Sequence, residues 1–232
     1  MIDKFKEIHY SFLLEKSIFI LQDNVLHSLF LNTPLLKEGE SYPLQEVFSY
    51  GSLAEDIFSF DFISIRSEVL GCSESEYINK NIKPLRYILE SKKNIVFYFS
   101  KNMSSLLNLI VLLAFFEENG FKNDVNLVLF DERDEEDITI RKIKLGDFSY
   151  IYKNIIFSKN TTKMSTLKCD KIFIEALVLY LHYNMENNEI KTFINEHINK
   201  ISVEDLYPLV FDKFKIYGFK KCHLEKLMKR NF

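Results

Sequence analysis

The segment that most constrains the fold is residues 94–130, where two runs of strand length flank an apolar helix. Residues 94–99 (Asn-Ile-Val-Phe-Tyr-Phe) and 125–130 (Val-Asn-Leu-Val-Leu-Phe) are almost continuously apolar, which is typical of strands buried on both faces of a parallel sheet. The helix between them begins at residues 100–105 and ends at Gly120, a residue that suits a helix C-cap. The segment therefore predicts a right-handed βαβ unit and an α/β fold.

Upstream of this unit, the pattern predicts a short strand, a helix and a second extended segment. Residues 7–13 are rich in aromatic and branched side chains over a short length, which favours a strand. Apolar residues recur at helical spacing over 16–30 and favour an amphipathic helix, although the sequence also allows a strand over 17–21. Residues 42–49 form the second extended segment. With the βαβ unit, these segments predict a parallel or mixed sheet with flanking helices.

A further helix over about residues 74–91 is predicted by a capping box at its start. The Ser73 hydroxyl can accept a hydrogen bond from the N–H three residues later, and Glu76 can reach back to the N–H of Ser73. Pro84 has no N–H to continue the helical pattern, so we expect a bend there. Residues 138–143 are expected to add one more strand, antiparallel at an edge of the sheet.

The character of the chain changes near residues 145–165. Beyond this point the pattern predicts consecutive helices, one of which starts at the N-cap Ser202 and stops at Gly218. We therefore expect an α/β domain over residues 1–150 and a helical C-terminal portion over residues 151–232, which packs on the first or stands apart. The helices are expected over residues 167–183, 190–198, 203–216 and 223–230.

The composition excludes several classes of protein. Of the 232 residues, 47% are hydrophobic, which argues against a disordered chain. Thirty basic and 33 acidic residues give a net charge of -3, so no overall field attracts nucleic acid or anionic lipid. The most apolar stretch, residues 106–116, is too short to cross a bilayer, and the N-terminus does not have the pattern of a signal peptide. Three widely spaced cysteines fit reduced thiols, so we expect a cytoplasmic protein.

Three short patches stand in a particular order along the N-terminal part. Ile8-His9 lies in the first expected strand, residues 48–54 (Phe-Ser-Tyr-Gly-Ser-Leu-Ala) follow the second extended segment, and residues 95–100 lead into the long apolar helix. In this order the patches resemble an uncharacterised bacterial family, the domain of unknown function eighteen thirty-five, over about residues 7–150. The resemblance implies an α/β fold and no particular reaction, because no activity is established for the family.

Three positions depart from the pattern of that family. Its members carry a Gly-Asp-Ser turn after the first strand, a Ser-Tyr-Gly-Pro-Leu-like loop followed by an Arg, and a strand that ends in Trp-aromatic-Gly. Here residues 11–15 (Ser-Phe-Leu-Leu-Glu) replace the turn, Ser52 stands in place of the Pro, and residues 98–100 are Tyr-Phe-Ser. The resemblance therefore supports the sheet and its loops, and it supplies no ligand chemistry.

Polar residues near the ends of the expected strands form the candidate site, because ligands bind beside the carboxyl ends of the strands in an open α/β sheet. Residues 100–105 open a helix whose free N–H groups and positive dipole end can receive an anion, although an ordinary N-cap has the same sequence. His9, expected at the same edge, either contacts a ligand or satisfies a backbone partner. The candidate ligand-binding residues are His9, Ser49, Tyr50, Gly51, Arg66, Ser100, Asn102 and Ser104.

Two charged segments have a simpler interpretation than a functional one. Residues 131–137 hold six carboxylates that could bind a divalent metal, but their spacing matches no calcium loop and an acidic run is usually a solvated loop. Residues 219–232 are basic and could contact nucleic acid, but a solvated terminal helix explains them better. We therefore expect no metal site, and nucleic acid is a disfavoured partner.

The leading hypothesis for function is a non-catalytic binding or regulatory module, because the chain contains no complete catalytic motif and no Gly-x-Ser-x-Gly. The alternative is an enzyme or small-molecule binder that uses a crevice at the carboxyl ends of the strands, with an anionic ligand at the helix N-terminus near residues 100–104. The expected partner is a small anionic ligand or another protein, and no membrane. The sequence identifies no cofactor.

Overall fold

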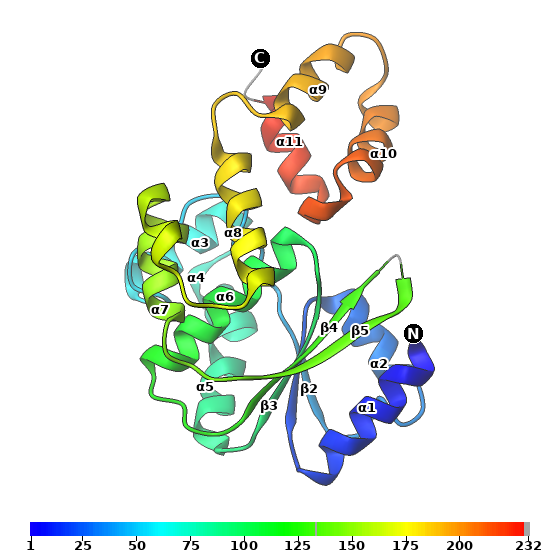
Figure 1. Cartoon of the computed structure of the whole chain (residues 1–232), viewed down its shortest axis with the longest axis vertical. Helices are drawn as coiled ribbons and strands as arrows, with labels where there is room; N and C mark the ends of the chain where they lie inside the picture. The colour runs from blue at the N-terminus through cyan, green and yellow to red at the C-terminus, as the bar shows by residue number, and fades with distance from the viewer. Residues whose placement is uncertain (133, 230–232) are drawn as a thin grey trace.

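The computed structural model of the chain describes residues 1–132 and 134–229 and has a five-stranded sheet at its centre (Figure 1). The strands lie in the order β2-β1-β3-β4-β5. The first four are parallel to one another, and β5 is antiparallel to β4. The chain therefore has the α/β fold with a mixed sheet that its sequence predicts. The strands are β1 (Ile18–Leu21), β2 (Glu40–Pro43), β3 (Ile95–Ser100), β4 (Val125–Asp131) and β5 (Asp134–Ile143).

Helices cover both faces of the sheet, and a further group stands at one end of the molecule (Figure 1). Helices α1 and α2 lie on one face and α3 to α7 on the other, while α9, α10 and α11 form the end group. Within the described residues, no helix is long and apolar enough to span a bilayer. The helices are α1 (Ile2–Leu14), α2 (Asn24–Leu31), α3 (Phe60–Leu70), α4 (Glu74–Tyr77), α5 (Lys83–Ser91), α6 (Met103–Glu118), α7 (Phe148–Ile151), α8 (Lys171–Asn184), α9 (Glu189–His197), α10 (Val203–Lys213) and α11 (Lys221–Lys229), with π-helical turns η1 (Ile78–Ile82) and η2 (Tyr152–Phe157) and 3₁₀ turns η3 (Thr161–Thr166) and η4 (Lys215–Tyr217).

The βαβ unit expected over residues 94–130 is confirmed as β3, α6 and β4. Asn102 caps α6, because its Oδ1 accepts a hydrogen bond from the N–H of Ser105 at 2.9 Å. Just past the helix, Gly120 has a φ of +66°, a left-handed conformation that glycine adopts without strain. α6 is buried on almost every side, which explains why its sequence is apolar all round rather than along one stripe.

The strand expected over residues 7–13 is wrong, because these residues belong to helix α1. Phe5, His9 and Phe12 are buried, and their spacing of four and then three is that of one helix face. A window that starts at residue 7 leaves out Phe5 and hides this period. The first strand is instead β1, where the sequence also allows one, and the helix expected over residues 16–30 is shortened to α2.

The segment between α2 and β3 is more irregular than expected. β2 covers only the start of the extended segment expected over residues 42–49, and the rest is loop. The capping residue Ser73 is confirmed, since its Oγ accepts from the N–H of Glu76 at 3.2 Å. Residues 74–91 are the continuous succession α4, η1 and α5. The π-helical turn η1 lies just before Pro84, which is where the missing N–H predicts a departure from regular helix.

The edge strand expected over residues 138–143 is confirmed as part of β5, which begins earlier, at Asp134. The described residues of the acidic run 131–137 therefore lie at the end of β4, in the turn at Glu132 and at the start of β5. Arg133 lies outside the described residues. In the described part of the chain, no three His, Cys, Asp or Glu side chains gather in a way that could hold a metal ion.

The helices expected after residue 165 are confirmed as α8, α9, α10 with η4, and α11. Ser202 Oγ accepts from the N–H three residues later at 3.1 Å, and Gly218 ends η4 with a φ of +62°. Residues 230–232 of the basic C-terminus lie outside the described residues. α8 packs on α6, and Leu224 of α11 belongs to the same hydrophobic cluster as β3 and α6. The helical portion thus shares its core with the α/β part.

Alternate residues of the strands face two separate hydrophobic clusters. Phe19 and Tyr98 face α1 and α2, whereas Ile20 and Phe97 face α6. His9 packs in the cluster that faces α1 and α2, and the centroids of its ring and that of Phe19 are 4.0 Å apart. The sheet therefore separates His9 from the candidate residues that lie around α6.

Candidate functional site

The carboxyl ends of β1 and β3 meet where the strand order changes direction, which is where open α/β sheets bind ligands. In this chain the side chain of Gln22, the residue after β1, connects the end of β1 to the end of β3. Its Oε1 accepts hydrogen bonds from the N–H of Ser100 at 2.7 Å and from Ser105 Oγ at 3.1 Å. The pocket lies instead beside the ends of β3 and β4.

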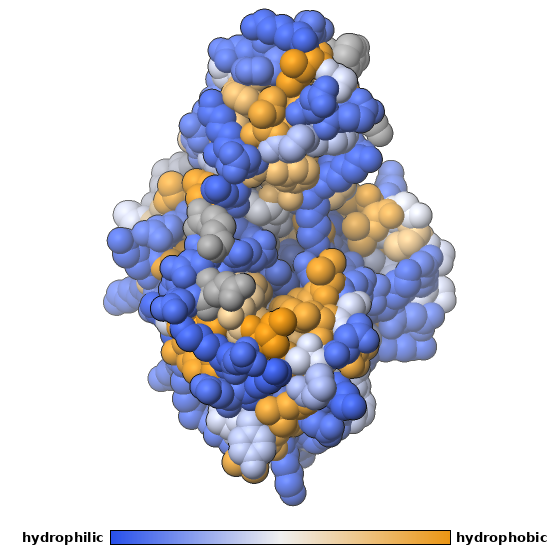
Figure 2. Space-filling model, turned by 90° about the vertical axis from the view of Figure 1, so that its right-hand side faces the viewer, coloured by the Kyte–Doolittle hydropathy of each residue, from blue (hydrophilic) through white to orange (hydrophobic). Residues whose placement is uncertain are grey.

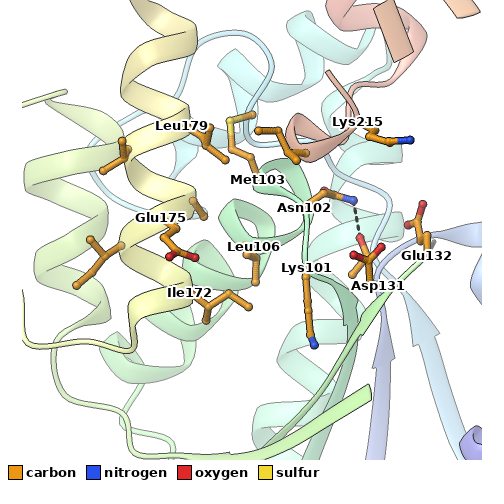
Figure 3. Close-up of a pocket in the computed structure, with 15 residues that line it drawn as sticks. Lys101, Asn102, Met103, Leu106, Asp131, Glu132, Ile172, Glu175, Leu179 and Lys215 are labelled. Atoms are coloured by element: carbon orange, nitrogen blue, oxygen red, sulfur yellow. Dashed lines mark hydrogen bonds between the residues drawn. The ribbon is translucent and has the colours of Figure 1, made fainter. Parts of the chain in front are cut away.

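This pocket, termed the strand-end pocket, has a volume of about 480 Å³ and lies between the ends of β3 and β4, the first turn of α6, α8 and η4 (Figure 3). Polar groups stand at its strand end, and most of its other lining side chains are apolar. Figure 2 shows the surface hollowed between the end group of helices and the body, with hydrophobic side chains gathered below the hollow. The apolar wall of the pocket includes Met103, Leu106, Ile172, Ile174, Val178 and Ile216.

Ser100 and Asn102, two of the candidate residues, line the strand-end pocket, and Figure 3 shows Asn102 near Asp131 at its polar end. Their side chains bond within the protein. Asn102 Oδ1 caps α6, Asn102 Nδ2 donates to Ser100 Oγ at 2.5 Å, and Ser100 Oγ donates to Ser105 Oγ at 3.0 Å. The side-chain donors expected to meet an anion at residues 100–104 are therefore engaged in a helix cap.

The charges around the strand-end pocket favour a cation over an anion. Lys101 pairs with Asp137 at 2.6 Å, and Lys215 pairs with Asp212 at 3.2 Å, so both lysines are compensated by acids outside the lining. Carboxylates that line the pocket outnumber these lysines, and their negative charge attracts a positively charged group. The lining carboxylates are Asp131, Glu132 and Glu175.

The end of the helical portion approaches the cap of α6 closely, and Gly218 makes this approach possible. A Cβ atom added at Gly218 would lie 2.0 Å from Asn102 Oδ1, far inside van der Waals contact. The φ of +62° at Gly218 also favours glycine over any other residue. Gly218, which ends η4, and Asn102, which caps α6, are therefore in close contact.

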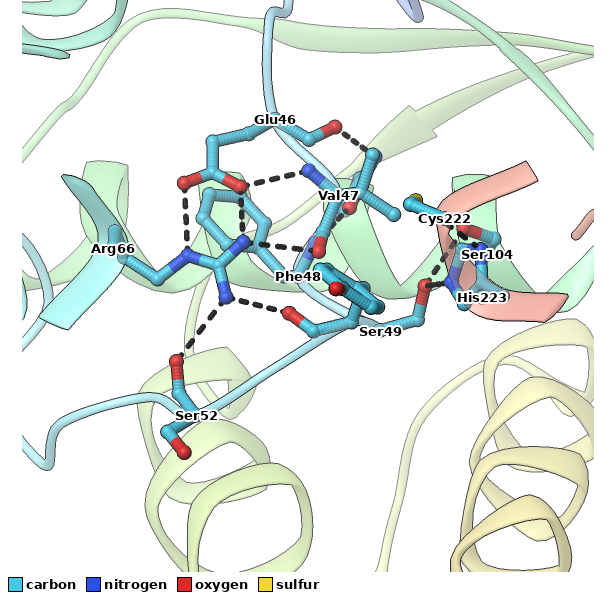
Figure 4. Close-up of polar contacts among 11 residues, drawn as sticks. Glu46, Val47, Phe48, Ser49, Ser52, Arg66, Ser104, Cys222 and His223 are labelled. Atoms are coloured by element: carbon cyan, nitrogen blue, oxygen red, sulfur yellow. Dashed lines mark hydrogen bonds and ion pairs between the residues drawn. The ribbon is translucent and has the colours of Figure 1, made fainter. Parts of the chain in front are cut away.

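Arg66 is fully buried and holds the loop of residues 49–53 (Figure 4). It donates to both carboxylate oxygens of Glu46, at 2.9 and 2.6 Å, and its Nη1 donates to the carbonyls of Tyr50 at 2.6 Å and Ser52 at 3.1 Å. Its Nη2 also donates to the carbonyl of Val47 at 3.1 Å, so all five N–H groups of the guanidinium donate within the protein. Burial alone would lower the pKa of Arg66, but the bonds and charge of Glu46 outweigh burial and raise it. Arg66 therefore anchors the loop.

Two members of this network, Glu46 and Asn108, are not among the candidate residues. Asn108 Oδ1 accepts from the N–H of Phe48 at 2.8 Å, and Asn108 Nδ2 donates to the carbonyl of Glu46 at 3.0 Å. Glu46 and Asn108 are both buried. For Asn108 the signal in the sequence is a single polar residue within an apolar run, because such a residue is buried only when its polar atoms find partners.

Ser49 bonds to His223 of α11, a histidine that sequence reasoning does not connect to this loop. The N–H of Lys220 donates to His223 Nδ1 at 2.9 Å, so Nδ1 is an acceptor and Nε2 carries the hydrogen. Nε2 then donates to Ser49 Oγ at 2.9 Å, and Ser49 Oγ bonds to Ser104 Oγ at 2.8 Å (Figure 4). In this tautomer the imidazole cannot accept the proton of Ser49. The pair has the contact of a catalytic Ser–His dyad without its chemistry.

His9 is buried on the other face of the sheet. Its Nε2 donates to the carbonyl of Glu38 at 2.8 Å, which is the backbone partner that the simpler interpretation of this histidine expects. Burial lowers the pKa of His9, because desolvation disfavours the charged imidazole. His9 is therefore a neutral residue of the core in this structure.

Ser49 and Gly51 line a second pocket of about 350 Å³, termed the loop pocket. It lies between the loop of residues 49–53, the end of η2, the end of α8, the start of α9 and one residue of α11, and its lining is largely polar. The ring of Tyr50 instead packs edge-on against His223, with 5.7 Å between centroids. The lining residues of the loop pocket are Ser49, Gly51, Ser52, Leu53, Ile156, Phe157, Lys159, Tyr180, Tyr183, Asn184, Lys191 and Leu227.

The structure therefore divides the candidate residues among several places. Ser100 and Asn102 line the strand-end pocket, whereas Ser49 and Gly51 line the loop pocket. Other candidates are buried: Ser104 lies beneath Ser49, Arg66 behind the loop, and His9 on the far face of the sheet. The candidate residues that line a pocket therefore belong to two separate pockets rather than to one crevice.

No family model matches the chain, and neither a curated protein nor a solved structure matches it. The resemblance to the domain of unknown function eighteen thirty-five stays a prediction.

Proposed function

We propose that the chain is a non-catalytic binding protein whose strand-end pocket takes a small molecule with an apolar body and a positively charged end. The observation that carries this proposal is an apolar wall combined with three carboxylates in a pocket of about 480 Å³. Small-molecule sites commonly have volumes of about 300–1,000 Å³, mostly apolar linings and a few polar groups that orient the ligand. An amphipathic cation matches both parts of this lining.

The preference for a cation is supported by how the charged residues of the pocket are paired. Lys101 and Lys215 already have acidic partners outside the lining. Glu175 pairs with Lys171 at 3.3 Å, and water weakens this largely exposed contact as it weakens that of Lys215 with Asp212, so the preference depends on the excess of carboxylates over lysines in the lining. A ligand cation that enters beside the apolar wall is partly shielded from water, so its attraction to the carboxylates is stronger than that of a surface lysine.

The non-catalytic part of the proposal is supported by the state of the residues that could act as acids, bases or nucleophiles. His223 is held in the tautomer that cannot activate Ser49. His9 is buried away from both pockets, and every donor of Arg66 is engaged. A protein that holds these groups in internal bonds is suited to binding rather than to proton transfer.

We further propose that the protein acts in the cytoplasm and is related to the family of the domain of unknown function eighteen thirty-five. The cytoplasmic location is supported by three free thiols. The relationship is supported by an α/β fold of the class that the resemblance implies. The free cysteines are Cys72, Cys169 and Cys222.

The proposal is tested by thermal shift and calorimetry with three probes of one shape: phenethylamine, phenethyl alcohol and 3-phenylpropionate. We expect the amine to raise the melting temperature and the acid to have no effect. Glu175→Gln is expected to weaken amine binding about threefold, the contribution of one partly screened charge. Val178→Ser, at an exposed position of the apolar wall, is expected to weaken the binding of amine and alcohol alike.

Two matched substitutions control for general effects of charge and hydrophobicity. Glu90→Gln changes an exposed glutamate of α5, and Val25→Ser changes an exposed valine of α2, and neither residue lines the pocket. Both variants are expected to bind the amine as the parent chain does. Equal binding of amine and acid, or equal weakening by Glu175→Gln and Glu90→Gln, would show that the proposed charge preference is wrong.

A further inference from the structure

We propose that two copies of this chain associate through strand β5, edge to edge and antiparallel, so that their two sheets join into one continuous sheet. This inference does not depend on the function proposed for the strand-end pocket. β5 is the last strand of the sheet, and within the described residues it pairs with β4 alone (Figure 1). It is ten residues long, and a long strand at the edge of a sheet presents unpaired backbone groups to another chain.

The backbone groups that point outward from β5 follow from the bonds of the neighbouring strand. The carbonyl of Phe130 accepts from the N–H of Lys101, which follows β3, so the backbone groups of Phe130 point toward β3. Because this direction alternates along a strand, Leu129 points toward β5, where it bonds with Thr139 opposite it. The same alternation on β5 turns every second residue outward. The residues of β5 whose N–H and C=O point away from β4 are Ile138, Ile140 and Lys142.

These outward groups are not occupied by the rest of the chain. Within the described residues, no hydrogen bond joins the N–H or C=O of Ile138, Ile140 or Lys142 to an element other than β5. Ile140 is also 51% exposed, although its side chain is apolar. Lys4 of α1 donates to the carbonyl of Glu136 at 3.3 Å, and this exposed contact lies before the outward stretch begins. The fold therefore leaves an edge of backbone donors and acceptors with a half-exposed isoleucine at its centre.

The charges along β5 form two halves of opposite sign. Residues 134–137 are all acidic, residues 141–142 are Arg-Lys, and Ile-Thr-Ile lies between them. A second copy that runs antiparallel places its basic half beside the acidic half of the first copy, and the same holds at the other end. A parallel arrangement in register would place like charges side by side, which is unfavourable. The pattern therefore favours an antiparallel copy of the same strand as the partner.

The outward groups select a register in which Thr139 lies on the two-fold axis. In an antiparallel pair, two residues exchange hydrogen bonds only when the backbone groups of both point toward the partner strand. With Thr139 on the axis, Ile138 stands opposite Ile140 of the second copy, and the two residues exchange both bonds. Asp137 then stands opposite Arg141 of the second copy. Because the interface is symmetric, each of these contacts occurs twice.

Asp137 and Arg141 have partners in their own chain, but neither residue is saturated by them. Asp137 pairs with Lys101 at 2.6 Å and is 48% exposed, whereas Arg141 pairs with Asp170 at 2.9 Å and is 42% exposed. A carboxylate accepts several bonds, and a guanidinium has five N–H groups. Each residue can therefore keep its own partner and still contact the second copy. Since the interface is narrow, we expect a weak, concentration-dependent dimer.

The first test is sedimentation equilibrium of the full chain over a range of concentrations up to about 1 mM, which covers the Kd values of weak contacts. We expect the apparent mass to rise from 27.6 kDa toward twice that value. Added salt is expected to weaken the association, because it screens the pairs of opposite charge. A chain that stays monomeric over the whole range would overturn the proposal.

Two charge reversals test the pairing of Asp137 with Arg141. In Asp137→Arg two arginines stand opposite each other, and in Arg141→Asp two aspartates do, so each variant alone is expected to raise the Kd of the dimer at least about tenfold. When the two variants are mixed in equal amounts, opposite charges face each other again at both ends, and we expect association as tight as that of the parent chain. Glu90→Arg and Arg86→Asp, at exposed positions of α5, are the matched controls. A mixture that does not restore association, or controls that weaken it equally, would overturn the proposal.

A proline tests the outward N–H of Ile140. Because this N–H does not bond to β4, Ile140→Pro keeps the ladder between β4 and β5, and proline is tolerated in edge strands at such positions. Ile140→Ala removes the same apolar contact but keeps the N–H. We expect Ile140→Pro to raise the Kd of the dimer at least about tenfold more than Ile140→Ala does, because symmetry removes two hydrogen bonds. Equal association of two variants that circular dichroism shows to be folded would overturn pairing through the backbone of β5.

Discussion

Arg66→Met is expected to be among the most destabilising single substitutions in this chain. Arg66 and Glu46 are both fully buried, with Nη2 and Oε2 2.6 Å apart. The substitution keeps an unbranched side chain of similar length but leaves the Glu46 carboxylate buried without its counter-ion. Removing one partner of a buried ion pair costs about 3–5 kcal/mol. Because domains unfold with a free energy of only about 5–15 kcal/mol, the variant loses a large share of its stability.

A double-mutant cycle separates the ion pair from the other bonds of Arg66. Glu46→Leu and the double variant complete the cycle, and Arg86→Met, at an exposed arginine of α5, is the control. We expect a coupling energy of about 1–3 kcal/mol between Glu46 and Arg66, because the double variant no longer buries an unpaired charge. Urea unfolding is followed by far-ultraviolet circular dichroism, since the chain has no tryptophan. A loss below about 1 kcal/mol in Arg66→Met, or additive losses in the cycle, would refute this reasoning.

The other predictions concern Gly218, His9 and His223, and the same unfolding assay measures all three. Gly218→Ala is expected to cost about 1–3 kcal/mol, because its Cβ would meet Asn102 Oδ1; Gly120→Ala, which has a similar positive φ and open space around it, is the control. The pKa of His9 is lowered by burial, so below about pH 6.5 the unfolded chain binds a proton that the folded chain excludes. Stability is therefore expected to fall as the pH drops from 7 to 5, and His9→Gln is expected to reduce that slope; an unchanged slope would contradict the assignment. His223→Phe is expected to cost about 1–3 kcal/mol, because it removes the bonds of a buried imidazole; a neutral effect would show that these bonds contribute little.

The parts of the fold that could be predicted are those whose signal is local. The continuous apolar runs of β3 and β4 and the caps at Ser73 and Ser202 are contained in short stretches of sequence, and the structure confirms them. Helix α1 is harder to predict, because aromatic and branched residues in a short window favour a strand, whereas the buried face of α1 extends from Phe5 to Phe12. There, packing on the sheet overrides local propensity.

The site could be predicted only in part, because its contacts join distant segments. Polar residues at the ends of strands are recognisable, and four of the candidates do line a pocket. No local pattern connects Ser49 to His223, which are 174 positions apart. The pairing of Glu46 with Arg66 leaves no such pattern either, since Gln45 precedes Glu46 and Ser67 follows Arg66, so neither is an isolated charge in an apolar run.

The strand-end pocket and the loop pocket both border the contact between the α/β part and the helical portion. This contact, termed the joint, includes the bond between Ser49 and His223 and the approach of Gly218 to Asn102. Ser49 lines the loop pocket and bonds to Ser104, which directly follows Met103 of the strand-end pocket. His223 and Gly218 of the helical portion are seated on this same joint. A ligand that binds only when the joint is formed stabilises it, so binding in the strand-end pocket is expected to depend on contacts of the joint that lie outside the pocket. His223→Phe changes the joint without changing the lining of the strand-end pocket, so it is expected to weaken the binding of phenethylamine in calorimetric titration, and unchanged binding would contradict this coupling.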